Sequence, residues 1–231
     1  MNNFYNQRKI LAIQPAGQGL LEAMLAIGLI LIGLGAVLTL TLKNISAVID
    51  SGQRVVAVNL AREGIDVVRG IRDSNWLAAS NSDPNRLWDH DYDDSEEVVA
   101  ANLVPSADDQ GARAILTLPS STLIAPVNFS IDFIDSRDVN DDSFKLYRDS
   151  ATYEWYQEDF SLNKETGFNR MILLDPICES AGVKAGESDC PAGDVKIGIR
   201  VQVQVAWNTT GIFGGINHRQ LEVTEYLYNW R

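Results

Sequence analysis

The stretch that decides the fold is residues 18–42, which read QGLLEAMLAIGLILIGLGAVLTLTL. From Ala23 to Leu42 every residue is apolar or glycine except Thr39 and Thr41. A helix of about 20 such residues spans the roughly 30 Å hydrocarbon core of a bilayer. The sequence therefore predicts a transmembrane helix over residues 18–42.

The charges on either side of this segment predict its orientation. Arg8 and Lys9 precede it, and the basic residues that follow are sparse, beginning with Lys43 and Arg54. The positive-inside bias places such an N-terminus in the cytoplasm and the rest of the chain outside. A secretory signal peptide fits poorly, because its apolar region runs only about 7–15 residues. We expect a single-pass cytoplasmic membrane protein.

Glu22 is an acid at the entrance to the apolar segment and calls for a partner. A carboxylate costs roughly 2.5–3.5 kcal/mol at the centre of a bilayer helix and less near the interface. Cleavage of the chain after Gly17 would give Gln18 an α-ammonium group four residues before Glu22. Residues four apart are neighbours on a helix, so this ammonium could neutralise Glu22 of its own or an adjacent helix.

The hexapeptide at residues 17–22, GQGLLE, follows a short basic leader and opens the apolar helix. In this arrangement it resembles the type IV prepilin motif. The resemblance implies that residues 1–17 are a leader peptide, that prepilin peptidase cuts between Gly17 and Gln18, and that Gln18 is then methylated. It also implies that Glu22 serves assembly with other pilin subunits and the pilus assembly machinery, drawing the subunit from the inner membrane into an extracellular pilus or pseudopilus. Two departures are Gln18, where Phe is usual, and Thr39, where many major pilins carry proline.

Residues 43–76 change period without a break and predict an amphipathic continuation of the helix. The apolar positions follow spacings of three and four, which place them on one face: Ile45, Ile49, Gly52, Val56, Leu60, Gly64, Val67 and Ile71. We expect the helix to run to about Asp73 and to end at Ser74 and Asn75. Residues 61–76, AREGIDVVRGIRDSNW, also resemble the same stretch of some minor pilins.

Four arginines lie together on another side of this helix: Arg54, Arg62, Arg69 and Arg72. The simplest interpretation is a solvated face with Asp50, Asp66 and Asp73 nearby. An alternative is that these arginines dock against the acidic heads of neighbouring subunits. Contact with DNA is a weaker alternative.

The rest of the chain predicts an acidic connector, residues 77–112, and an antiparallel β head, residues 113–231. Strands are expected at 113–118, 127–134, 144–147, 152–157, 171–174, 195–208 and 218–230. Strict alternation over 195–208 indicates a strand with one apolar face, and the Gly-rich segment 209–217 leads to the return strand. An apolar sheet face needs a cover, which the helix stripe can supply. The expected fold is α+β, a pilin-like ladle with the long helix packed on the sheet.

The composition argues against several functions. Asp and Glu number 31 against 19 Lys and Arg, a net charge of −12 in 231 residues. No direct nucleic-acid contact is expected of so acidic a chain, because phosphate binding needs concentrated positive charge. With two histidines and none of the common catalytic motifs, the head is expected to be non-enzymatic and to need no cofactor.

Three local patterns predict sites in the head. Cys178 and Cys190 flank a turn-rich segment and predict a disulfide outside the membrane. A partial EF-loop pattern, in which Asp138, Asn140, Asp142 and Asp149 would supply oxygen ligands, allows a weak Ca²⁺ site. However, Ser143 replaces the usual glycine, and an ordinary Asx turn is the alternative. The acidic run of residues 89–97 predicts a solvated loop, with a cation site as the alternative.

The leading functional hypothesis is a minor pilin, that is, a structural subunit of a type IV pilus. A pseudopilin of a type II secretion or competence system is the first alternative. The second is a membrane-anchored ectodomain that binds a ligand or a metal without assembling.

Overall fold

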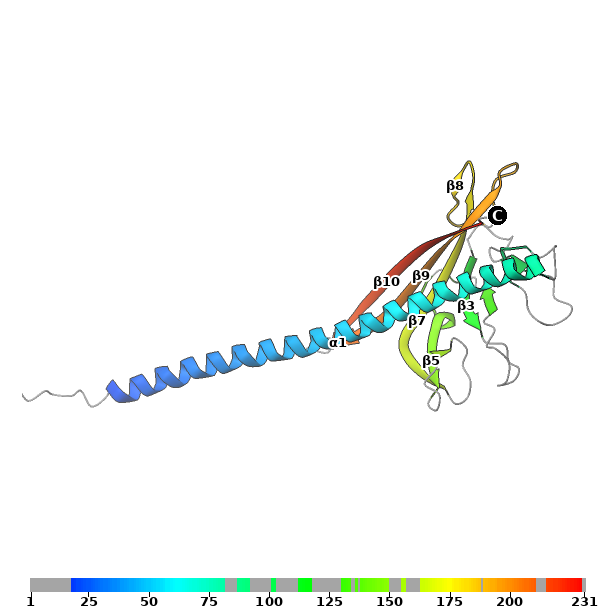
Figure 1. Ribbon diagram of the computed structural model, residues 1–231. Helices are drawn as coiled ribbons and strands as arrows, with labels where there is room; N and C mark the ends of the chain where they lie inside the picture. Colours follow the sequence, from blue (N-terminus) through cyan, green and yellow to red (C-terminus); the bar gives the residue numbers. More distant parts are fainter. Residues whose placement is uncertain are drawn as a thin grey trace, which may run out of the picture. The chain divides into compact units, whose positions relative to one another are not determined.

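The computed structural model describes residues 18–81, 87–91, 101–102, 112–117, 130–133, 136, 138–149, 155–156, 163–187, 189–210 and 215–229 (Figure 1). The chain divides into two compact units, Met1–Val48 and Ile49–Arg231. The helix α1 (Gln18–Asn81) supplies the described part of the first unit and the opening element of the second. Gly17 and the rest of the expected leader lie outside the described residues.

The second unit is a mostly antiparallel β domain. Its strands are β1 (His90–Asp91), β2 (Ala101–Asn102), β3 (Ala112–Thr117), β4 (Ser130–Phe133), β5 (Lys145–Asp149), β6 (Trp155–Tyr156), β7 (Asn163–Cys178), β8 (Gly182–Val183), β9 (Lys196–Thr210) and β10 (Ile216–Tyr228), with a 3-10 helix η1 (Asp142–Phe144). The main sheet has the order β10-β9-β7-β3-β4, and β5, β6 and β8 pair off this path. The strands β1 and β2 form a separate two-stranded sheet.

Helix α1 packs on one face of this sheet, the α+β layout that the sequence predicts for a pilin-like fold (Figure 1). On the sheet side the core is the inward row of β9 with two residues of β7: Ile199, Val201, Val203, Val205, Ile172 and Leu174. The alternate β9 side chains Gln202 and Gln204 stay half-exposed. The predicted alternation over 195–208 is therefore confirmed.

The buried face of the helix includes the predicted stripe from Val56 onward and is wider than that stripe: Leu60 and Gly64 are buried, and Val56, Val67 and Ile71 pack against the core. Its core residues are Ala57, Leu60, Ala61, Ile65 and Val68. Ile49 and Gly52, which the spacing placed on that stripe, are exposed. At Gly64 the helix lies close to the sheet, since a Cβ there would be 3.3 Å from Val203 Cγ2. Small residues let the helix approach the sheet closely, and this approach widens the buried face.

The helix ends later than predicted, at Asn81 instead of about Asp73. Ser74 stays exposed, whereas Asn75 is buried and its Nδ2 donates to the Trp88 backbone oxygen at 3.2 Å. The Arg72 guanidinium lies 4.7 Å from the ring centroid of Trp76. The tertiary contact of Asn75 with Trp88 and the contact of Arg72 with Trp76 within the helix stabilise its last turns.

Other boundaries shift for similar reasons. The predicted connector, 77–112, begins inside α1, contains β1 and β2, and ends at the first residue of β3. Strand β7 is 16 residues long, although the sequence marks only 171–174, because polar residues in its first half interrupt the apolar pattern. The predicted final hairpin is confirmed as β9 and β10, which pair without a register shift.

Candidate assembly helix

The candidate functional residues at the start of α1 are Gln18 and Glu22. Gln18 is the first residue of α1, and Glu22 lies one helical turn further on. Glu22 is exposed, and the nearest basic residue along the described helix is Lys43, at the far end of the apolar segment. The structure therefore gives Glu22 no cationic partner within the described part of this helix. A positive group at the backbone nitrogen of Gln18 would lie within one turn of Glu22.

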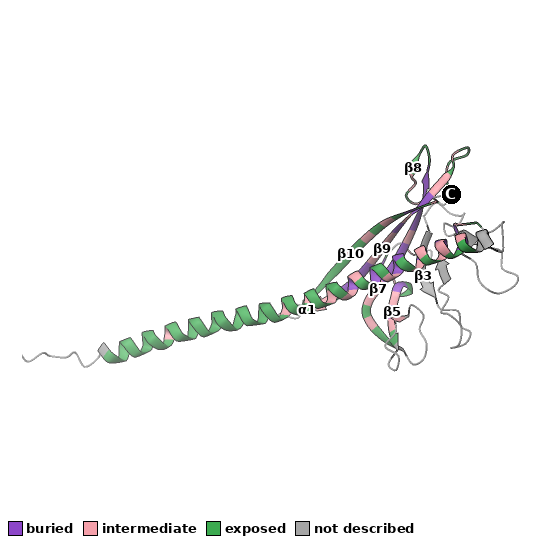
Figure 2. Cartoon of the chain, in the orientation of Figure 1, coloured by how far each residue is buried: buried purple, intermediate pink, exposed green. Residues whose placement is uncertain are grey.

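The apolar segment that follows leaves its side chains uncovered in the described chain (Figure 2). Leu20 and Ile32 are each 72% exposed, and α1 has the length and hydropathy to cross a membrane. The two threonine side chains of this segment form hydrogen bonds within the helix: the Thr39 and Thr41 hydroxyls donate to the Ala36 and Val37 carbonyls, each at 2.9 Å. Internal pairing of polar groups is what a lipid environment requires.

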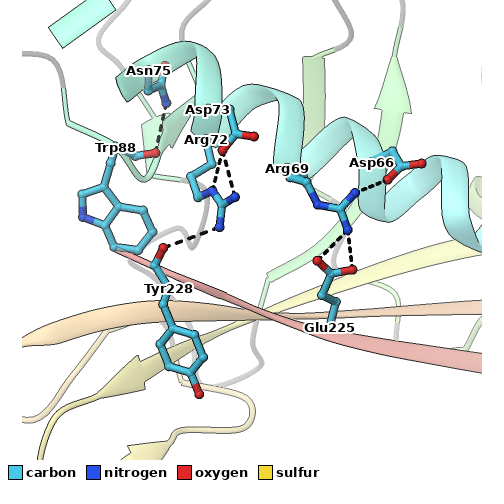
Figure 3. A network of polar contacts seen from close by, with 8 residues as sticks. All are labelled: Asp66, Arg69, Arg72, Asp73, Asn75, Trp88, Glu225 and Tyr228. Carbon is cyan, nitrogen blue, oxygen red and sulfur yellow. Dashed lines mark hydrogen bonds and ion pairs between the residues drawn. The ribbon is translucent and has the colours of Figure 1, made fainter. Parts of the chain in front are cut away.

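Two of the four helix arginines contact the sheet, so the expected solvated face is wrong for them (Figure 3). Arg69 Nη2 donates to both carboxylate oxygens of Glu225 in β10, each at 2.6 Å, and Arg69 Nη1 pairs with Asp66 at 2.5 Å. The hydrogen bond to Glu225 raises the pKa of Arg69. Arg72 is buried and reaches the Tyr228 carbonyl oxygen at 3.5 Å.

These contacts fix β10 alongside α1. Arg54 and Arg62 remain exposed, so they alone of the four keep the exposure that the sequence predicts.

A buried ion pair that the sequence did not reveal joins the helix to the centre of the sheet. Arg170 in β7 is 1% exposed, and its Nη1 lies 2.7 Å from Glu63 Oε2 and 3.3 Å from the Leu60 carbonyl oxygen. Burial lowers the pKa of the Arg170 guanidinium, while the Glu63 charge acts in the opposite direction. The missed signal is the position of Arg170, two residues before Ile172 on the inward side of β7.

The predicted disulfide is present between Cys178 and Cys190, with the two Cα atoms 5.6 Å apart. Two carboxylates further anchor the loop that it closes. Buried Asp175 accepts from the Gly186 backbone N–H at 2.8 Å and from Arg200, which pairs with it across β7 and β9. Asp194 accepts from three backbone N–H groups, that of Ser180 first, and these bonds lower its pKa.

Replacing both cysteines by serine is expected to lower the free energy of unfolding by about 3 kcal/mol. The bridge restricts the conformations that the unfolded chain can adopt and so lowers its entropy. Denaturant unfolding of the full chain in detergent measures the change. Reduction of the wild-type protein is the matched control and should give the same loss. A double variant as stable as the oxidised wild type would contradict the prediction.

The four candidate calcium ligands make separate local contacts in the structure. Asp138 Oδ1 accepts from both the backbone N–H and the side-chain amide of Asn140, at 2.9 and 2.8 Å, and these bonds lower the Asp138 pKa. Asp142 pairs with Lys145 at 3.0 Å. Asp149 lies in β5, opposite Asn163 of β7. Across the ranges that the structure describes, no group of three or more His, Cys, Asp or Glu side chains is placed to hold a metal ion.

The acidic run of residues 89–97 is not wholly solvated, which corrects the expectation for its first member. Asp89 is buried and forms an ion pair with Lys196 at the start of β9. This pair ties the segment after α1 to the sheet. Residues 92–100 lie outside the described residues.

The candidate site is therefore an acid one helical turn after Gln18, followed by an uncovered apolar segment of the same helix. Comparisons with known protein families, with curated proteins and with solved structures find no match to this chain.

Proposed function

We propose that the chain is a structural subunit, a minor pilin, of a type IV pilus. The observation that carries the proposal is the first described turn of α1, in which Glu22 lies one turn after Gln18 at the entrance to an uncovered apolar segment. Cleavage by prepilin peptidase would create the α-ammonium of Gln18, which is then methylated. That charge is the partner that Glu22 lacks in the described chain.

The remaining features support a membrane precursor with an external head. The apolar part of α1 anchors the subunit in the inner membrane, with the leader in the cytoplasm. The Cys178–Cys190 bridge supports a head outside the cytoplasm, because structural disulfides persist in oxidising compartments. Helix packing in place of lipid would then cover the apolar segment within the assembled filament.

The proposal predicts cleavage by a defined peptidase at a defined bond. When the chain is expressed with a prepilin peptidase, mass spectrometry should find an N-terminus at Gln18 carrying one methyl group. Gly17→Arg should abolish cleavage almost completely, because a long charged side chain cannot occupy the place of a glycine next to the scissile bond. Gly19→Ala is the matched control: a Cβ at Gly19 meets no atom of the described chain within 4 Å, so cleavage should continue.

Retention of residues 1–17 in cells that contain the peptidase would contradict the proposal and favour a membrane-anchored ectodomain that does not assemble. Mature chain in sheared surface fibres would support a pilus. Mature chain confined to the cell envelope, with a secretion or DNA-uptake defect in its absence, would identify a pseudopilin instead.

A further inference from the structure

Strand β10 runs alongside α1 in the same direction and begins at the end of the head where the chain enters. Arg219 Nε lies 3.4 Å from Asp50 Oδ1, while Arg69 contacts Glu225 and Arg72 contacts Tyr228 further along both elements. Ile216 begins the strand three residues before Arg219, which carries it about 10 Å beyond that contact. The β9–β10 hairpin therefore reaches past Asp50 at the entry end of the head.

This end of the head is also close to the bilayer by chain connectivity alone. Six residues, 43–48, separate the apolar segment from the first residue of the head unit. Even a fully extended chain of six residues covers only about 20 Å. Whatever path these residues take, the entry end of the head cannot lie far from a membrane that holds the apolar segment.

The surface of the hairpin end suits a lipid interface. Ile216 is 66% exposed, and Asn217 and His218 beside it are exposed (Figure 2). No Asp or Glu occurs from residue 195 to residue 221, although the chain contains 31 acids. The acid that contacts this end, Asp50, is paired with Arg219.

The opposite end of β9 lies beside exposed acids that form no part of the hairpin. Exposed Glu179, Glu187 and Asp189 lie in the disulfide loop, beside the end of β7 and the start of β9 (Figure 1). Toward the hairpin end of the sheet, exposed Asp142 and Glu165 lie in η1 and at the start of β7, and both pair with Lys145. A strand end that carries no acid of its own and exposes Ile216 is suited to a lipid interface.

We propose that the hairpin end of the head, at Ile216, Asn217 and His218, rests on the lipid headgroups while the subunit is stored in the membrane. This contact would hold the head at the bilayer surface before assembly. The inference depends on the proposed membrane anchoring, but it concerns a separate surface.

The test uses the full chain in vesicles of phosphatidylethanolamine and phosphatidylglycerol. Asn217→Cys, labelled with an environment-sensitive fluorophore, reports on the hairpin. Ala185→Cys, exposed in the disulfide loop, is the matched control. Nitroxide carried on the lipid headgroups should quench the label at residue 217 at least threefold more than the label at residue 185. Adding Ile216→Ser should reduce that quenching while the protein still floats with the vesicles.

Equal, weak quenching at both positions in floated protein would overturn the inference and leave membrane anchoring intact. Shielding of residue 217 by a second copy, detected as cross-linked dimers without lipid quenching, would also overturn it. Failure of the chain to float would instead contradict the anchoring on which the proposed function rests.

Discussion

Replacing Glu22 by alanine is expected to leave peptidase cleavage intact and to lower incorporation into filaments at least tenfold. The carboxylate lies one turn from the first residue of α1 and has no cationic partner in the described helix. If the ammonium of Gln18 pairs with Glu22 of a neighbouring subunit, the attraction acts in a medium of low dielectric constant. A factor of ten requires only 1.4 kcal/mol, which is modest for such a pair. Quantification of the subunit in sheared fibres, against the mature subunit in the membrane, measures the loss.

Glu22→Asp is the matched control, because it retains the charge on a side chain one methylene shorter. It should be processed and should keep part of the incorporation that alanine loses. Normal incorporation of Glu22→Ala would show that charge pairing does not drive assembly, even if the leader is removed as expected.

The sequence predicts those elements that depend on short stretches of the chain. The apolar run of residues 23–42 predicts the long helix, and the alternation over 195–208 predicts β9 with its inward row. The cysteine pair follows from the turn-rich segment between its members. In each case hydrophobic periodicity or chain composition decides the outcome without knowledge of distant contacts.

What the sequence could not predict is how much of the helix surface the sheet buries. The predicted stripe contains the buried Leu60 and Gly64, but the close approach of Gly64 to Val203 and Ile172 also buries Ala57, Ala61 and Val68 beside that stripe. This packing also brings Arg69 and Arg72 to β10. Helical spacing alone contains no information about a strand more than 150 residues away.

The candidate assembly site also has one part that local sequence predicts and one part that it cannot. The sequence predicts Gly17, Gln18 and Glu22 from local spacing, and in the structure Glu22 lies one helical turn after Gln18. Gly17 lies outside the described residues. Under the proposed function, the group that completes the site is the ammonium of a processed N-terminus, either of the same chain or of a neighbour. A single unprocessed chain cannot display it.

Removing Glu63 from the Arg170 pair is expected to destabilise the head more than removing Arg170. Glu63→Met removes the Glu63 carboxylate from a guanidinium that is 2% exposed, whereas Arg170→Met leaves a carboxylate that is 37% exposed and can be hydrated. A hydrogen bond to a charged group contributes about 1.5–3 kcal/mol. We expect Glu63→Met to lower the free energy of unfolding by about 2 kcal/mol and Arg170→Met by about 1 kcal/mol.

The double variant should recover most of this loss, because replacing a buried ion pair by apolar residues of similar volume is often neutral or stabilising. Denaturant unfolding of the four proteins, each as full chain in detergent, gives the coupling energy directly. Arg62→Met, one residue before Glu63 and exposed, is the control and should change stability by no more than about 0.5 kcal/mol. If the double variant loses the sum of the two single effects, the pair is uncoupled. The helix would then be held on the sheet by the contacts of Ala57, Ala61, Gly64 and Val68 without electrostatic help.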